Sequence, residues 1–114
     1  LREQLCPGPV PPLGVNEEPI SLGEGDTPLL RLPHLERSLG FTNLWVKDEG
    51  TNPTGAFKAR GLSAAITRAV AAGAMRFTIP TAGNAGVASA AYAARAGAQV
   101  RVYAPKSTPR TILS

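Results

Sequence analysis

One short pattern occurs twice in the second half of the chain, and it restricts the fold more than any other feature. Gly73-Ala74 leads into an apolar run that ends at Pro80, and Gly97-Ala98 leads into a second run that ends at Pro105. Each run has the length of a strand, and the stretch between them has the spacing of a helix. Strands that alternate with helices predict an α/β fold, with a parallel sheet and helices on both of its faces.

The remaining segments predict further elements around this repeat. We expect strands over residues 28–32, 44–47, 75–80 and 99–104, and helices over 35–39, from 58 to the glycine at 73, and over 84–96. Thr108 is expected to cap a further helix that begins at Pro109. Prolines at five of the first 25 positions predict an irregular arm over residues 1–25, followed by an incomplete α/β domain over residues 26–114. Such a partial sheet would have an unpaired edge and an uncovered face.

Composition excludes several classes of function. The net charge is +4, but the lysines and arginines are dispersed along the chain and do not alternate with aromatic residues, which argues against nucleic acid and favours a small anionic molecule. The single cysteine, Cys6, can form neither an internal disulfide nor a metal site alone. The apolar runs are far below the ~18 residues that span a bilayer, so we expect no membrane association and a cytosolic location.

One lysine stands where a loop is expected to turn into a helix. Lys58 lies in the segment Asn-Pro-Thr-Gly-Ala-Phe-Lys-Ala-Arg-Gly, residues 52–61. The N-terminus of a helix carries roughly half a positive charge, which disfavours an ammonium and favours the neutral, nucleophilic amine of a Schiff-base lysine. Leu62, Ala65, Ile66, Ala69 and Val70 form an apolar stripe, and Lys58 lies four residues before it, so we expect the lysine on the buried face. A solvated surface lysine is the alternative.

A second loop is expected at the same edge of the sheet. Thr81-Ala82-Gly83-Asn84-Ala85-Gly86 connects a predicted strand to a predicted helix, and ligands of open α/β sheets bind outside the carboxyl ends of the strands. A glycine-containing turn that opens a helix offers backbone N–H groups to an anion, although such turns are also common in packing alone. The turn lacks the GxGxxG pattern of a dinucleotide-binding loop.

Three segments together carry a resemblance to a known family. Residues 21–29 (SLGEGDTPL), 46–61 (VKDEGTNPTGAFKARG) and 81–86 (TAGNAG) resemble, in order and spacing, the tryptophan-synthase-β-like, fold type II family of pyridoxal-phosphate enzymes. The resemblance covers roughly residues 20–110. Within the family, the Gly-Glu-Gly opening and the Asn-Pro-Thr-Gly form of the lysine loop are similar to the N-terminal part of the threonine synthase branch.

The resemblance implies roles for the residues of both loops. Lys58 would bind pyridoxal 5'-phosphate covalently and act as the catalytic residue, Phe57 would lie beside the cofactor ring, and Asn84 would hydrogen-bond the ring hydroxyl. The substrate carboxylate would be received by Thr81, Ala82, Gly83, Asn84 and Ala85. Relatives commonly have a hydroxyl where this chain has Ala56 and Ala82, but the backbone donors survive both changes.

The implied activity belongs to a longer protein. It is the conversion of O-phospho-L-homoserine and water to L-threonine and phosphate, with threonine or serine dehydratase chemistry as the alternative. A further alternative is a non-catalytic α/β fragment, because the family's cradle for the cofactor phosphate and its partner for the pyridine nitrogen lie downstream of Ser114. We therefore expect the isolated chain to be inactive. The oligomeric state of the full-length protein is left open.

Overall fold

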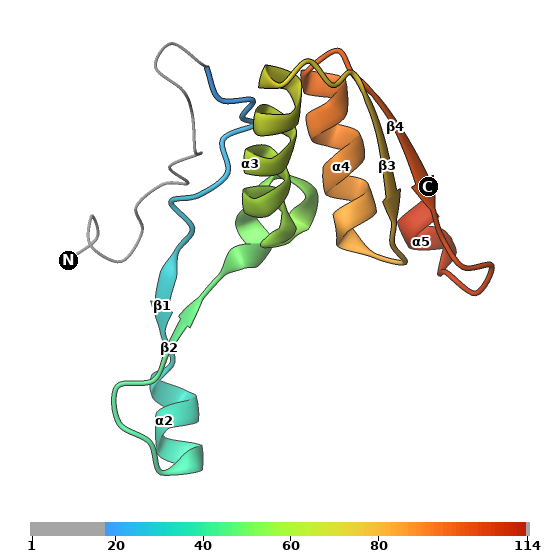
Figure 1. The fold of residues 1–114 in the computed structure, drawn as a ribbon. Helices are drawn as coiled ribbons and strands as arrows, with labels where there is room; N and C mark the ends of the chain where they lie inside the picture. The colour runs from blue at the N-terminus through green and yellow to red at the C-terminus, as the bar shows by residue number, and fades with distance from the viewer. Residues whose placement is uncertain (1–17, 114) are drawn as a thin grey trace.

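The computed structural model describes residues 18–113, and its elements follow the expected order (Figure 1). The strands are β1 (Leu29–Arg31), β2 (Trp45–Lys47), β3 (Arg76–Pro80) and β4 (Gln99–Tyr103). The α-helices are α2 (Pro33–Leu39), α3 (Lys58–Ala71), α4 (Asn84–Arg95) and α5 (Arg110–Leu113), and two short 3-10 turns, η1 (Glu49–Thr51) and η2 (Pro53–Gly55), precede α3. Residues 18–28 form neither helix nor strand. Cys6 and the first four prolines of the expected arm lie outside the described residues.

The strands form two separate sheets instead of one. β3 and β4 pair in parallel, with Arg76 opposite Gln99 and Pro80 opposite Tyr103, as a strand–helix–strand unit predicts. β1 and β2 pair antiparallel, so the expectation that all strands join one parallel sheet is wrong for this pair. The chain between β1 and β2, residues 32–44, consists of the short helix α2 and a turn. This connection reverses the chain direction, so the two strands pair antiparallel.

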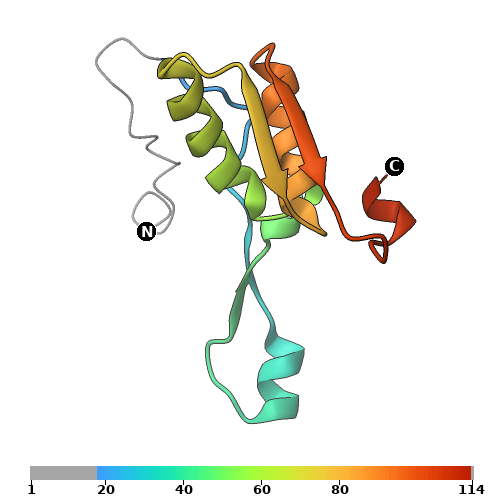
Figure 2. The same cartoon turned by 45° about the vertical axis from the view of Figure 1, so that its right-hand side comes forward.

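Helices on both faces of the parallel sheet are not confirmed. Figure 2 shows α4 behind β3 and β4 with α3 to one side of them, and α4 packs against both strands and against α3. Phe77 and Val100 pack against the buried core, whereas their neighbours Arg76 and Gln99 are exposed. Because side chains alternate across a strand, the second face of the pair is open in the described part of the chain, as expected of a partial sheet.

Small residues form the core between α3 and α4. The buried cluster consists of Ala59, Ile66, Ala88, Tyr92 and Ala93. Alanine at three of these positions lets the two helices approach closely, and Tyr92, which is fully buried, fills the remaining space. The abundance of alanine in the sequence therefore serves helix–helix contact.

The expected apolar stripe of α3 is confirmed in part. Ile66 is buried, and Leu62 and Val70 pack against the core, whereas Ala65 is exposed. Ser63 and Thr67 are buried as well: the Ser63 hydroxyl donates to the carbonyl of Ile20 at 2.9 Å, and the N–H of Ile20 donates to Thr67 Oγ1 at 2.9 Å. The chain near residue 20 thus covers a polar strip of α3 that adjoins the apolar stripe.

The helix ends are mostly as expected, with one exception. Gly40 and Gly97 take left-handed φ values of 72° and 67° after α2 and α4, a conformation in which glycine carries no Cβ penalty. The expected helix cap at Thr108 is wrong, because α5 begins at Arg110 and the buried Thr108 hydroxyl has no hydrogen-bond partner.

β1, α2 and β2 project from the body that α3, α4, β3 and β4 form (Figure 1). We call this projection, residues 29–47, the arm; it is distinct from the irregular N-terminal segment expected over residues 1–25. Seven large apolar side chains of the arm are exposed: Leu29, Leu30, Leu35, Leu39, Phe41, Trp45 and Val46. Glu36 is the one buried residue among positions 29–47. The hydrophobic surface of this region is therefore not used to fold the described part of the chain.

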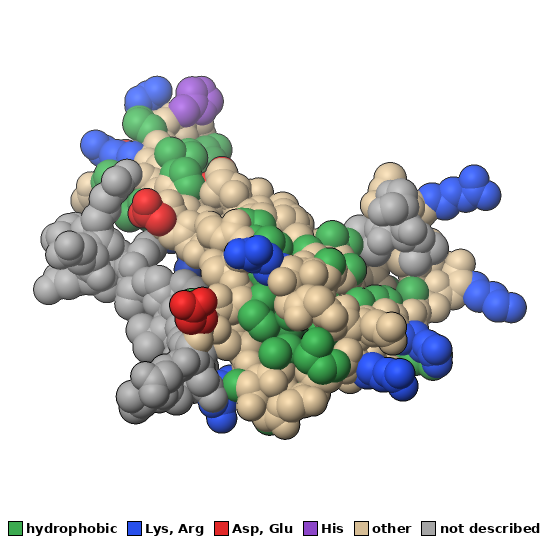
Figure 3. Space-filling model, turned by 90° about the horizontal axis from the view of Figure 1, so that it is seen from above, with side chains coloured by type: hydrophobic (Ala, Val, Ile, Leu, Met, Phe, Trp, Pro, Cys, Tyr) green, Lys and Arg blue, Asp and Glu red, His purple; other side chains and the backbone are tan. Residues whose placement is uncertain are grey.

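Surface charge is scattered on the face that Figure 3 shows. Lysine and arginine side chains project singly or in small groups around its rim, and hydrophobic side chains lie between them. In residues 18–113, no helix is long and apolar enough to cross a bilayer. The same residues contain no group of three or more histidine, cysteine, aspartate or glutamate side chains placed to hold a metal ion.

Candidate active site

The two predicted loops come together at one end of the body. α3 begins at Lys58 and α4 begins at Asn84, and Figure 1 shows both helices beginning at the end where the arrows of β3 and β4 point. The turn η2, just before Lys58, packs against α4 as well as α3. The lysine loop therefore lies beside the helix that follows the Gly-Asn turn, although β2, the strand before the lysine loop, is not part of the parallel sheet on which the carboxyl-edge argument was based.

Lys58 lies on the outside of its helix. Its side chain is exposed, so the expected position on the buried face is wrong; the buried residue is the next one, Ala59. Successive residues lie about 100° apart around an α-helix, so Lys58 and Ala59 point in different directions. The ammonium lies 4.9 Å from the centre of the Phe57 ring, which is itself 59 % exposed. An amine in this position can be reached by a ligand from solution.

Two backbone N–H groups of the turn before α4 already donate hydrogen bonds within the chain. The N–H of Thr81 donates to the carbonyl of Tyr103 at 2.9 Å, and the N–H of Gly83 donates to Thr81 Oγ1 at 3.2 Å. Asn84 and Ala85 open the helix, where N–H groups have no partner within the helix itself. Of the five residues expected to receive an anion, Thr81 and Gly83 therefore already donate their N–H groups within the chain.

Gly86 has a packing role in the same turn. A Cβ atom at this position would lie 3.0 Å from Thr81 Cγ2 and 3.1 Å from Val102 Cγ1. At Gly83 a Cβ would meet nothing within 4 Å. The last glycine of the turn thus lets α4 approach the strands, and the first leaves open space in front of the helix.

A cluster of hydrogen-bonded polar side chains joins the two ends of the lysine loop. We call Thr27, Glu49, Asn52 and Arg60 the Glu49 cluster. Arg60 donates to both carboxylate oxygens of Glu49, at 2.7 and 2.9 Å, and Thr27 and Asn52 each donate to the same carboxylate at 2.7 Å. The Asn52 oxygen accepts the N–H of Gly25 at 3.0 Å. Arg60, chiefly, and then Thr27 and Asn52 hold the pKa of Glu49 at about 2 in spite of its partial burial.

Glu24 joins the opening segment to α4. Its carboxylate accepts from the Tyr92 hydroxyl at 2.7 Å, from the N–H of Leu22 at 3.0 Å and from the Ser21 hydroxyl at 3.1 Å. Burial opposes the charge, but the hydrogen bonds of Ser63, Tyr92 and the backbone outweigh it and lower the pKa of Glu24 to about 2. Burial, and then the contact with Glu24, raises the pKa of Tyr92.

Sequence reasoning quoted Glu24, Glu49 and Asn52 in the motifs but gave none of them a role. The sequence did contain a sign that these side chains interact. Arg60 follows the lysine by two residues, and Glu24, Glu49 and Asn52 precede it in loops. Buried charges require partners, and Arg60 was the available cation. What could not be foreseen was that Glu49, eleven residues earlier, is the partner.

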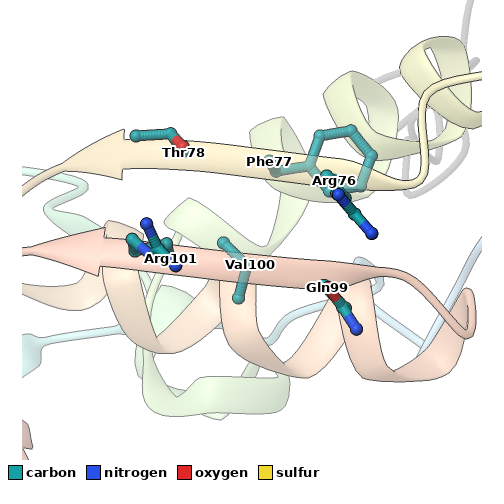
Figure 4. A pocket seen from close by; sticks show the side chains of 6 residues that line it. All are labelled: Arg76, Phe77, Thr78, Gln99, Val100 and Arg101. Atoms are coloured by element: carbon teal, nitrogen blue, oxygen red, sulfur yellow. The ribbon is translucent and has the colours of Figure 1, made fainter.

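A hollow of about 510 Å³ lies elsewhere on the body. Figure 4 shows it over the amino-terminal halves of β3 and β4, with the helices behind the strands. Its lining residues are Arg76, Phe77, Thr78, Gln99, Val100 and Arg101. The Gly-Asn turn follows the opposite, carboxyl end of β3, and the lysine loop packs against α4, so the hollow is separate from the candidate site.

Comparisons with known proteins show the family of this chain. Residues 20–113 match the family model described as pyridoxal-phosphate dependent enzyme. The chain is 45 % identical over 87 residues to the threonine synthase of Methanocaldococcus jannaschii, covering 76 % of this chain and 22 % of that protein. It is 43 % identical over 95 residues to the threonine synthase of Mycobacterium leprae, covering 83 % of this chain and 26 % of that protein.

The matches cover most of this chain but only part of each relative. The chain spans about a quarter of the length of the curated relatives it matches. The family model, by contrast, covers nearly all of the described residues, including both loops of the candidate site. The cofactor of that family is pyridoxal phosphate. An exposed lysine amine can react with the aldehyde of such a cofactor, and the exposed aromatic ring beside it can contact the planar cofactor ring. The chain belongs to the pyridoxal-phosphate-dependent enzyme family.

Proposed function

We propose that this chain is the lysine-bearing part of a threonine synthase, which converts O-phospho-L-homoserine and water to L-threonine and phosphate. Three observations support the choice within the family: the relatives named above, the Gly-Glu-Gly opening and the Asn-Pro-Thr-Gly loop. The observation that carries the site is the packing of η2 against α4, which brings the lysine loop beside the Gly-Asn turn. The activity is that of the full-length protein.

Lys58 is the proposed catalytic residue. Its exposed amine at the first position of α3 can attack an aldehyde carbon, and the bond it forms would anchor the cofactor. When the amine of a substrate replaces it, Lys58 would be freed at the same place, where it can take or give a proton as a general base or acid. Both roles need an amine that ligands can reach.

Phe57 and the start of α4 would position the ligands. The Phe57 ring lies next to the lysine and is open on its surface, so it can cover one side of a planar cofactor. Asn84 would hydrogen-bond the hydroxyl of the cofactor ring. The N–H groups of Asn84 and Ala85, at the positive end of the α4 dipole, would receive the substrate carboxylate.

Bound pyridoxal phosphate supplies an electron sink for negative charge that develops next to the substrate amine. The chain's own contribution is to bind, orient and exchange protons at Lys58 Nζ. A phosphorylated amino acid and a phosphorylated cofactor are both anionic, and a net charge of +4 favours their approach. The cytosolic location expected from the sequence stays a prediction.

Two parallel assays of the full-length protein test this function. Phosphate release would be measured with O-phospho-L-homoserine, and ammonia release would be measured with L-threonine. We expect phosphate release with formation of threonine, and loss of that activity in Lys58→Ala. Deamination of threonine without phosphate release would contradict the proposal and favour dehydratase chemistry.

A further inference from the structure

The carboxylate of Glu49 stands between the two ends of the lysine loop. It accepts from Asn52, six residues before Lys58, and from Arg60, two residues after it. We propose that Glu49 is a positioning residue for Lys58, because its contacts fix both ends of the segment that carries the lysine. This proposal rests on the proposed function of Lys58 and deepens it.

All four acceptor positions of the Glu49 carboxylate are in use. Oε1 accepts from Thr27 and from Arg60 Nη2, and Oε2 accepts from Asn52 and from Arg60 Nε. A carboxylate has about four lone-pair sites, so nothing remains for a ligand or a proton at neutral pH. Glu49 therefore acts through its partners and not by touching the substrate.

The bond to Arg60 is directional. Nε and Nη2 bind the two oxygens side by side, at 2.7 and 2.9 Å, which matches the fork of a guanidinium to the plane of a carboxylate. Such a pair restricts rotation of the arginine side chain, and Arg60 belongs to the first turn of α3 together with Lys58. The pair thus sets where the first turn of this helix lies relative to the loop.

The loop between the two anchors needs this support. Thr54 takes a left-handed φ of 68°, which is rare for a β-branched residue, and its buried hydroxyl has no hydrogen-bond partner. A backbone in such a conformation persists where surrounding contacts impose it. Asn52 supplies the upstream anchor: it is 4 % exposed, donates to the carbonyl of Glu49 at 3.0 Å and accepts from Gly25.

The arm contains a matched control for this pair. Glu36 accepts from Arg31 Nε at 3.0 Å and Nη2 at 2.9 Å, and from the N–H of Leu44 at 2.9 Å. It is therefore also a carboxylate with a forked arginine and a further donor. Glu36→Gln removes the same kind of interaction at a residue whose carboxylate partners, Arg31 and Leu44, both belong to the arm.

The test uses the full-length protein and pyridoxal phosphate itself. Wild type, Glu49→Gln and Glu36→Gln would be titrated with the cofactor below the onset of their thermal unfolding, and the fraction attached to Lys58 would be measured by borohydride reduction and peptide mass spectrometry. Because a small misplacement of a reacting group is costly, we expect Glu49→Gln to need at least about tenfold more cofactor for half attachment, and Glu36→Gln to stay within about twofold of wild type.

Other results would overturn the proposal. Glu49→Gln that attaches the cofactor as wild type does, or Glu36→Gln that loses as much, would show that Glu49 has no special relation to Lys58. If Glu49→Gln does not fold, Arg60→Lys keeps the positive charge but cannot bind both carboxylate oxygens as a fork. An unchanged cofactor concentration for half attachment in Arg60→Lys would also overturn the proposal. A wild type that attaches no cofactor at Lys58 would remove the proposed function itself, which is a distinct outcome.

Discussion

The body and the arm each contain one forked glutamate–arginine pair, yet they are stabilised in different ways. In the body, Glu49–Arg60 adjoins a core of Ala59, Ile66, Ala88, Tyr92 and Ala93. In the arm, Glu36–Arg31 is surrounded by apolar side chains that remain exposed, Phe41 and Leu39 most of all. The same polar contact therefore lies beside a packed core and the candidate site in one region, and beside exposed apolar side chains in the other.

The largest expected difference concerns the buried aromatic residue of the body. Tyr92→Ala would leave a cavity and remove a donor from Glu24, so we expect a loss of about 3–5 kcal/mol in the free energy of unfolding. Trp45→Ala in the arm, where the side chain is 48 % exposed, should cost about 1 kcal/mol or less in the 114-residue chain. Urea denaturation measures both, and equal losses would break the distinction between body and arm.

Acid should destabilise the body through two carboxylates. The pKa values of Glu24 and Glu49 are about 2 in the folded chain, below the ordinary value of 4.5. A carboxylate with a depressed folded pKa contributes stability above its unfolded pKa, and that contribution falls as both groups protonate. Stability should therefore fall between pH 4.5 and about 2.

The same titration distinguishes the contributors. Melting temperature measured against pH should show a shallower acid slope in Glu24→Gln, because one of the two titrating groups is gone. An unchanged slope in Glu24→Gln would mean that its hydrogen bonds with Tyr92 do not lower its pKa in solution.

A smaller effect should come from the contact between the opening segment and α3. Thr67→Val removes the oxygen that accepts the N–H of Ile20, so we expect a loss of about 1–3 kcal/mol. Thr78→Val, on the open face of β3, should change stability by about 0.5 kcal/mol or less. Chemical denaturation compares the two, and equal effects would show that the segment near Ile20 is not held to the body.

Local features could be predicted from the sequence, and long-range ones could not. Asn84 at the start of α4 and Gly97 after its end follow from spacing and turn chemistry. The buried face of α3 is wider than predicted because Ser63 and Thr67 find partners at Ile20, more than 40 residues away in sequence. No periodicity in the helix itself contains that information.

The same limit applies to the candidate site. The family resemblance predicts roles for Lys58, Phe57 and Asn84, and these roles stay predictions. The lysine loop does pack against α4, but not through parallel strand order, because β2 lies outside the parallel sheet. Lys58 is exposed although it lies four residues before the apolar stripe, so the prediction of its burial was wrong. Glu49 was missed because its role arises only when the loop brings it to Arg60.

The central claim is that Lys58 is the amine that binds the cofactor. The chain has two other lysines, Lys47 and Lys106, which serve as internal controls. The full-length protein would be incubated with pyridoxal phosphate, reduced with borohydride, digested and mapped by mass spectrometry. The account predicts that, within these 114 residues, the reduced cofactor is found on Lys58 alone. Its presence on Lys47 or Lys106 in place of Lys58, or on none of the three, would contradict it.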